Sequence, residues 1–141
     1  MLKILLLQLK RKQKNNGFFM KTIAIIGASV NRKKFGNKCV RAYKQLGWKI
    51  FPINPKEKEI EGIKCYSSIN ELPEKPDRVS VYLPSQVTIS LIPELKEAGI
   101  SGVILNPGAE SDELVAELKQ NNIEPVKVCS IRLEGIDPDS L

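Results

Sequence analysis

A buried strand that runs directly into a glycine turn and a helix most restricts the fold of this chain. Residues 22–26 (TIAII) are all apolar or β-branched, which predicts a strand covered on both faces, as in a parallel sheet. Residues 27–29 (GAS) end the strand, and a helical pattern opens near Phe35. The N–H groups and dipole at a helix start favour an anion, and small residues let a ligand approach closely. The stretch 21–36 therefore predicts an α/β fold with a phosphate-binding turn.

The rest of the chain alternates short apolar strands with helical segments. The patterns predict strands at 22–26, 48–53, 78–83, 102–105 and 125–128, and helices at 35–46, 85–98 and 112–121. Because Pro93 interrupts the helix over 85–98, we expect a kink or two pieces there. The expected buried stripe of this helix is Val87, Leu91, Leu95 and Ala98.

This alternation predicts the fold class. Strands that alternate with helices form a parallel sheet with helices on both faces. Right-handed crossovers then lead to a single Rossmann-like, doubly wound domain, in which we expect five parallel strands in the order 3-2-1-4-5. Ligands in such folds bind outside the carboxyl ends of the strands, beside strand 1. We therefore expect four loops to gather at one site: 27–36, 54–56, 83–85 and 106–108.

Composition and charge exclude several classes of function. The net charge is +6, but residues 1–19 hold five basic residues and no acid, which leaves +1 for residues 20–141. A nearly neutral domain lacks the basic footprint of a nucleic-acid binder. The chain has no histidine, which excludes Ser-His-Asp and Cys-His catalysis and the commonest metal ligand. Its three cysteines lack zinc or redox spacing. We expect no catalytic residue, no metal and a reducing, cytoplasmic location.

The first 19 residues read as an extension of the domain. An apolar start precedes the basic residues, the reverse of a secretory signal, and residues 2–9 are too short to span a bilayer. We expect a disordered extension outside the native domain, which would begin at Met20 and run to Leu141. A basic amphipathic contact with a membrane surface is the lesser alternative.

The turn after the first strand matches nucleotide fingerprints only in part. Of the three glycines in G-x-G-x-x-G, only Gly27 is present, and the Walker A pattern is missing. Asn54 ends the second strand, where an NAD site has an acidic residue. The basic run at 32–34, together with Lys56, instead suggests a ligand with more phosphate charge than NAD.

Five segments resemble the family of small stand-alone CoA-binding proteins, whose Rossmann-like domain is related to the CoA-binding domain of the succinyl-CoA synthetase alpha subunit. The segments are IAIIGASVNRKKFGNK (23–38), IFPINPK (50–56), VSVYLPS (79–85), GVILNPGAES (102–111) and CSI (129–131). The resemblance runs from Met20 to about Leu133. It implies that coenzyme A or an acyl-CoA lies across the strand ends. Ligase activity is not expected, because the synthetase's second domain and phosphorylated histidine have no counterpart here.

The resemblance implies a role for each loop. The first loop would take the pyrophosphate, and Asn54-Pro55 would border the adenosine, with Lys56 near its 3′-phosphate. The residues after the third strand would give the adenine an apolar wall, and those after the fourth would line the way to the pantetheine arm. The implied cofactor-binding residues are Gly27, Ala28, Ser29, Arg32, Lys33, Lys34, Phe35, Gly36, Asn54, Pro55, Lys56, Leu83, Pro84, Asn106, Pro107 and Gly108.

Two classes of function stay open. The first is a module that binds coenzyme A or an acyl-CoA without catalysis of its own, as a monomer or homodimer whose partner is the small molecule. The second is an NAD(P)-dependent oxidoreductase, a regulatory dinucleotide-binding module or a remnant acyl-CoA ligase. Asn54 in place of an acid and the missing histidine favour the first. Structural alternatives are a solvated loop at 32–34, a packing role for Gly36 and a simple strand end at Asn54-Pro55.

Overall fold

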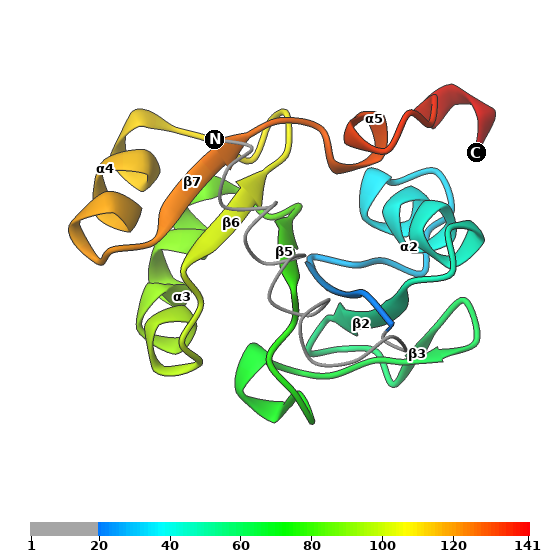
Figure 1. Cartoon of the computed structure of the whole chain (residues 1–141), viewed down its shortest axis with the longest axis horizontal. Coiled ribbons are helices and arrows are strands. Elements are labelled where there is room, and N and C mark those ends of the chain that lie inside the picture. The colour runs from blue at the N-terminus through cyan, green and yellow to red at the C-terminus, as the bar shows by residue number, and fades with distance from the viewer. Residues whose placement is uncertain (1–19) are drawn as a thin grey trace.

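The computed structural model describes residues 20–141. Its main feature is a five-stranded parallel sheet with helices on both faces (Figure 1). In chain order the elements are β1 Thr22–Ile26, α2 Phe35–Gln45, β2 Lys49–Ile53, β3 Glu59–Ile60, β4 Ile63–Lys64, the 3-10 turn η1 Ile69–Glu71, β5 Arg78–Val81, α3 Ser85–Glu97, β6 Gly102–Leu105, α4 Asp112–Gln120, β7 Glu124–Lys127, α5 Ser130–Leu133 and the 3-10 turn η2 Pro138–Ser140. The predicted fold class, a Rossmann-like α/β domain with five parallel strands, is confirmed.

Strand β1 lies inside the sheet and is buried along its whole length. Its side chains alternate between two cores, because successive residues of a strand point to opposite faces. Ala24 and Ile26 belong to the core that contains residues of α3 and α4, whereas Ile23 and Ile25 belong to the core beneath α2. The sequence of β1 therefore contributes to both layers of the domain.

The predicted strand order is wrong. The sheet has the order β2-β1-β5-β6-β7, so the third strand of the sheet lies on the opposite side of β1 from β2. Pro52 in β2 has no N–H to donate to a second neighbouring strand. A strand that contains a proline therefore belongs at a sheet edge. Tyr66 covers the outer edge: its N–H donates to the Pro52 carbonyl at 2.9 Å, and its carbonyl accepts from Asn54 N–H at 2.9 Å.

Helix α3 differs in part from its prediction. It continues through Pro93 as one helix, which excludes the alternative of two pieces, and its buried residues are Thr88, Ile92 and Leu95, of which Leu95 belongs to the predicted stripe. Val87, predicted to be buried, is 44% exposed. The buried face is rotated from the predicted stripe because one side of the helix borders a cavity and not the core.

Short elements complete the domain. The hairpin β3–β4 lies between β2 and η1, and α5 and η2 lie within the C-terminal segment. Within residues 20–141, every helix is too short or too polar to cross a bilayer. The predictions for residues 1–19 lie outside the described part of the chain.

Candidate ligand-binding site

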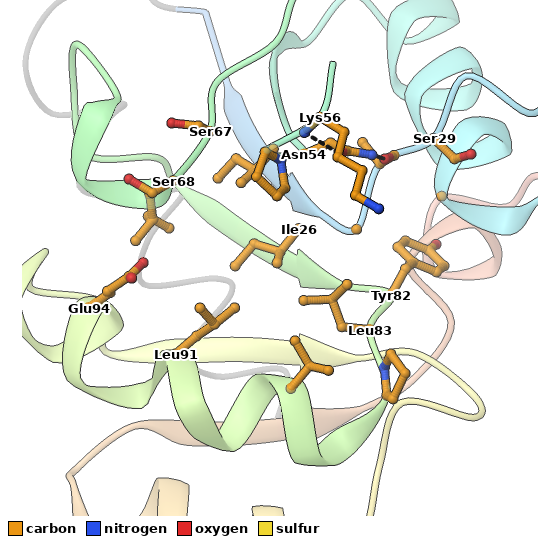
Figure 2. A pocket seen from close by; sticks show the side chains of 18 of the residues that line it. Ile26, Ser29, Asn54, Lys56, Ser67, Ser68, Tyr82, Leu83, Leu91 and Glu94 are labelled. Carbon is orange, nitrogen blue, oxygen red and sulfur yellow. Dashed lines mark hydrogen bonds between the residues drawn. The ribbon is translucent and has the colours of Figure 1, made fainter. Parts of the chain in front are cut away.

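A cavity of about 850 Å³ opens where β1, β2 and β5 end (Figure 2). The turns that follow these three strands meet there because the strands are parallel neighbours. The predicted site residues among its lining are Gly27, Ala28, Ser29, Lys34, Phe35, Gly36, Asn54, Pro55, Lys56, Leu83 and Pro84. Arg32, Lys33 and the turn at 106–108 are not part of this lining.

Two glycines bring the start of α2 against the turn after β1. Gly27 has φ of +88°, and a Cβ there would lie 2.9 Å from the backbone of Tyr82. A Cβ on Gly36 would lie 2.3 Å from the Gly27 carbonyl oxygen. Gly36 therefore allows α2 to pack closely against the turn after β1, as the structural alternative for this residue predicts. Among residues 20–141, the amides of Phe35 and Gly36 have no hydrogen-bond acceptor, so they are available to an anion.

Asn54 joins the turns after β1 and β2. Its side-chain Nδ2 donates to the Ala28 carbonyl at 2.9 Å, and its Oδ1 accepts from the backbone N–H of Lys56 at 2.9 Å (Figure 2). Both functions of the amide are used, so its orientation is fixed by its neighbours. This side chain sets the separation of two walls of the cavity and is more than a strand end.

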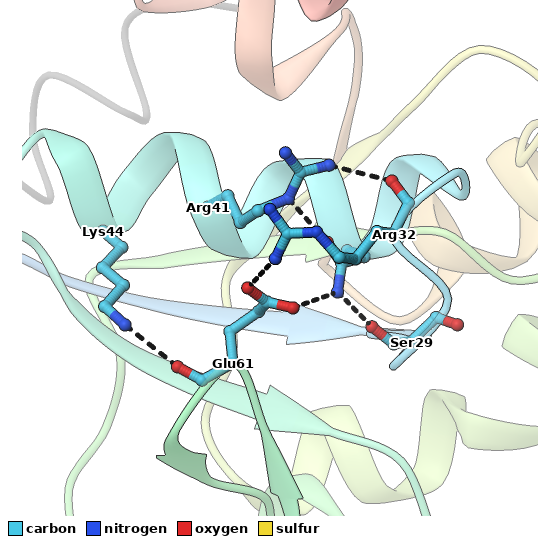
Figure 3. Close-up of polar contacts among 6 residues, drawn as sticks. Ser29, Arg32, Arg41, Lys44 and Glu61 are labelled. Carbon is cyan, nitrogen blue, oxygen red and sulfur yellow. Dashed lines mark hydrogen bonds and ion pairs between the residues drawn. The ribbon is translucent and has the colours of Figure 1, made fainter. Parts of the chain in front are cut away.

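The basic residues of the first loop separate into two groups. Lys34, at the N-cap of α2, lines the cavity, as does Lys56 from the turn after β2. Lys33 is exposed outside it, and Arg32 forms an ion pair with Glu61 at the tip of the β3–β4 hairpin (Figure 3). Two cations, from two different turns, therefore face the cavity.

Glu61 also supports the first loop through Asn37. Asn37 Nδ2 donates to the Glu61 carboxylate at 3.1 Å and to the Ser29 carbonyl at 2.9 Å. Arg41 Nε donates to Asn37 Oδ1 at 2.8 Å, so the buried amide is fully satisfied. The hydrogen bond from Asn37, with the bond and charge of Arg32, holds the pKa of Glu61 below its ordinary value. The sequence analysis missed Glu61, whose only local signal is the turn dipeptide Glu61-Gly62.

The turn after β6 lies outside the cavity lining and is tied to the C-terminal segment. Asn106 is buried, and its Nδ2 donates to Ser80 Oγ at 2.8 Å and to the Val81 carbonyl at 2.9 Å. Its Oδ1 accepts from the backbone N–H of Ser130 at 2.8 Å, which fixes the start of α5. Because β5 separates β6 from β1, this turn is two strands from the centre of the site. Asn106 therefore anchors the C-terminal segment, and the predicted place of residues 106–108 near the pantetheine arm stays a prediction.

The cavity also has a wall that the sequence analysis did not assign to the site. It comes from η1, its flanking residues and the cavity side of α3, where Ser68, Leu91 and Glu94 are labelled in Figure 2. The helical period of α3 was recognised, but Val87, Leu91 and Leu95 were assigned to its buried stripe and not to a site. The additional lining residues are Ile26, Ile53, Ser67, Ser68, Ile69, Tyr82, Val87, Leu91, Glu94 and Leu95.

A hydroxyl of the first loop is hydrogen-bonded within the protein, and a thiol of α2 is buried. Ser29 Oγ accepts a hydrogen bond from Asn31 N–H at 3.0 Å, within the loop itself. Burial raises the pKa of the Cys39 thiol to about 12, which keeps it protonated and unreactive. Within residues 20–141, no three potential metal ligands lie together.

The chain belongs to the family described as the CoA binding domain, which matches residues 21–135. Among curated proteins, it is 33% identical over 117 residues to an ADP-forming acetate–CoA ligase of Methanocaldococcus jannaschii, covering 83% of this chain and 17% of the ligase. It is 35% identical over 122 residues to ADP-forming acetate–CoA ligase II of Archaeoglobus fulgidus, covering 84% of this chain and 18% of that protein. The chain thus spans less than a fifth of these relatives.

Small proteins of similar length share the fold. A conserved hypothetical protein from Pyrococcus furiosus is 34% identical with a TM-score of 0.71, and the match covers 82% of this chain and 99% of that one. An uncharacterized protein of Bacillus subtilis is 27% identical over 100 residues, covering 71% of this chain and 74% of its own. The domain thus resembles both ligase parts and separate small proteins.

Proposed function

We propose that this chain binds coenzyme A or an acyl-CoA in the cavity at the strand ends, without catalysing a reaction of its own. The observation that carries the proposal is the convergence of Lys34, Lys56 and the free amides at the start of α2 on one end of a cavity. Membership of the CoA binding domain family supports the ligand class. The three free cysteines are consistent with the reducing cytoplasm, where we place the protein.

The charges of the ligand match this end of the cavity. Coenzyme A carries a 5′-diphosphate and a 3′-phosphate on one ribose, so its anions are close together. The diphosphate would lie on the amides of Phe35 and Gly36 beside Lys34, where the helix dipole adds to the attraction. Lys56, from the neighbouring turn, would face the 3′-phosphate.

The same geometry disfavours NAD. Dinucleotide sites use an acidic side chain after the second strand to accept from the ribose hydroxyls. Asn54 occupies that place, and its uncharged amide oxygen, which already accepts from the Lys56 N–H, is a weaker acceptor than a carboxylate. Binding without catalysis is supported by the absence of histidine from the sequence and by the engaged hydroxyl of Ser29.

Titration calorimetry and thermal shift with coenzyme A, dephospho-CoA, NAD and NADP test the proposal. Coenzyme A should raise the melting temperature most, because a ligand that binds only the folded state stabilises it. Lys56→Ala should weaken coenzyme A binding by about tenfold and leave dephospho-CoA, which lacks the 3′-phosphate, nearly unchanged. Lys58→Ala is the matched control, since Lys58 is exposed outside the cavity. Stabilisation by NAD without any by coenzyme A would contradict the proposal.

A further inference from the structure

The tip of the β3–β4 hairpin carries a residue that the turn itself does not favour. Glu61 and Gly62 connect the two strands, and both have positive φ, 51° and 76°. A two-residue turn of this kind favours asparagine, aspartate or glycine at its first position, because these residues adopt left-handed backbone angles most easily. The reason for a glutamate therefore lies in contacts that its longer side chain makes outside the hairpin.

The polar contacts of Glu61 lead to the first loop and to α2. Its carboxylate forms the ion pair with Arg32, and its carbonyl accepts from Lys44 Nζ at 3.0 Å (Figure 3). The second carboxylate oxygen accepts from Asn37 Nδ2 at 3.1 Å. Because Asn37 is in the first turn of α2 and Lys44 in the last, the hairpin is joined to the helix near both of its ends.

Asn37 connects Glu61 to the backbone of the first loop. It is fully buried, and the same Nδ2 that donates to Glu61 also donates to the Ser29 carbonyl at 2.9 Å. Arg41, which donates to Asn37 Oδ1, also donates from a terminal nitrogen to the Arg32 carbonyl at 2.8 Å. The carbonyls of Ser29 and Arg32 are therefore held by one chain of contacts that begins at Glu61.

These two carbonyls control how the chain enters the anion-binding end of the cavity. Residues 30–33 are exposed, so packing against the core does not fix their position. Lys34 and the free amides at the start of α2 come directly after them. A helix N-terminus binds an anion through amides that point at it, so the direction in which the loop enters α2 determines the quality of the site.

We propose that Glu61 is a positioning residue for anion binding, which holds the first loop and the start of α2 in the conformation that binds the diphosphate. The inference rests on the proposed function for the identity of the anion, and it adds a residue that does not line the cavity. A negative charge near an anion site weakens binding by repulsion. Removal of Glu61 would therefore strengthen binding if its charge were decisive, and weaken it if its positioning role is decisive.

Calorimetry with coenzyme A and with inorganic pyrophosphate tests the proposal. Glu61→Ala should weaken the binding of both ligands about tenfold, because the site is no longer preorganised. Glu61→Gln keeps the acceptor for Asn37 and should recover most of the affinity. Glu59→Ala is the matched control, since Glu59 is an exposed residue of the same hairpin and lies outside the cavity.

Glu61→Asn separates a positioning role from a purely structural one. Asparagine is the favoured residue of this turn, but its side chain is uncharged and one methylene shorter. The variant should keep a melting temperature close to that of the wild-type chain and still bind pyrophosphate about tenfold more weakly. A melting temperature that falls together with the affinity would make Glu61 a residue of general stability and would overturn the inference.

The outcomes also separate the inference from the proposed function. If the wild-type chain binds neither ligand, both proposals fail. If it binds pyrophosphate but not coenzyme A, the proposed function fails alone, and weaker pyrophosphate binding by Glu61→Asn supports the positioning role. If it binds coenzyme A and the Glu61 variants bind equally well or more tightly, the inference alone is overturned. Should Glu61→Ala unfold, Glu61→Asn carries the same decision.

Discussion

The same dipeptide, Asn-Pro, ends two parallel strands of this domain and serves two different purposes. Asn54, after β2, is half-buried and ties together two turns that line the cavity. Asn106, after β6, is only 1% exposed and holds the backbone of β5 and the start of α5. Both amides use their donor and their acceptor. The first arrangement shapes the cavity, and the second joins the C-terminal segment to the sheet.

Strand order explains the difference between the two turns. β2 is paired directly with β1, so the turn after it lies beside the glycine turn. β6 is paired with β5 and β7, so the turn after it faces the end of the chain. The role of an Asn-Pro dipeptide at a strand end therefore depends on which strands lie beside it, and not on the dipeptide alone.

Asn106→Ala should produce the largest loss of stability. It removes hydrogen bonds to three buried partners and leaves the Ser130 N–H unsatisfied, at a cost of about 3 kcal/mol in the free energy of unfolding. Urea denaturation measures this loss, with the exposed Asn70→Ala as the control. The folded fraction should still bind coenzyme A, because Asn106 does not line the cavity. Normal stability combined with lost binding would reverse the roles assigned to the two turns.

Asn54→Ala should affect binding more than stability. Loss of its two partly exposed hydrogen bonds should lower the free energy of unfolding by about 1 kcal/mol. The turns would no longer hold Lys56 in place, so we expect about tenfold weaker coenzyme A binding by calorimetry. Asn54→Asp keeps the acceptor for Lys56 N–H but adds negative charge, and should bind at least as weakly as Asn54→Ala. Unchanged affinity in both variants would leave Asn54 a simple strand end.

The smallest effect concerns Glu61 and depends on pH. Its pKa in the folded chain lies below the ordinary 4.5, first because Asn37 donates to it and then because of Arg32. A depressed carboxyl pKa gives stability that is present above about pH 4.5 and is lost as the pH falls through the folded value. Glu61→Gln should therefore cost about 0.5 kcal/mol at pH 7 and almost nothing near pH 3.

Urea midpoints at the two pH values measure the Glu61 effect. The hydrogen bonds of Asn106 join uncharged groups, so the penalty of Asn106→Ala should be the same between about pH 5 and 7. A Glu61→Gln penalty that does not change with pH would show that charge contributes nothing to the first loop.

Local sequence was sufficient for the fold class and for the turns after the first three sheet strands. The apolar run of β1 and the glycines at positions 27 and 36 have structural roles that follow from the residues themselves: burial on both faces, a positive φ and close packing. The strand order was also accessible, because Pro52 marks β2 as an edge strand, but that signal was not used. The predicted order placed β6 beside β1, whereas β5 separates the two strands and the turn after β6 lies outside the cavity lining.

Other parts of the site depend on contacts between distant segments. Glu61 meets Arg32 only when the β3–β4 hairpin folds beside the first loop. Val87 and Leu91 have the spacing of core residues, yet they face the cavity because α3 is rotated relative to the sheet. Periodicity identifies the helix, but the face that it buries is set by its neighbours.

The prolines of the two edge strands also bear on aggregation. Pro52 lies in β2 and Pro125 in β7, whereas β1, β5 and β6 contain none. A strand that lacks an N–H group is a poor template for a further strand, and the exposed charges of Glu124 and Lys127 at the ends of β7 reinforce this. The strands inside the sheet are rich in β-branched residues, which favour pairing with other chains when such a segment is exposed. Their two proline-bearing neighbours thus limit the growth of the sheet by addition of other chains.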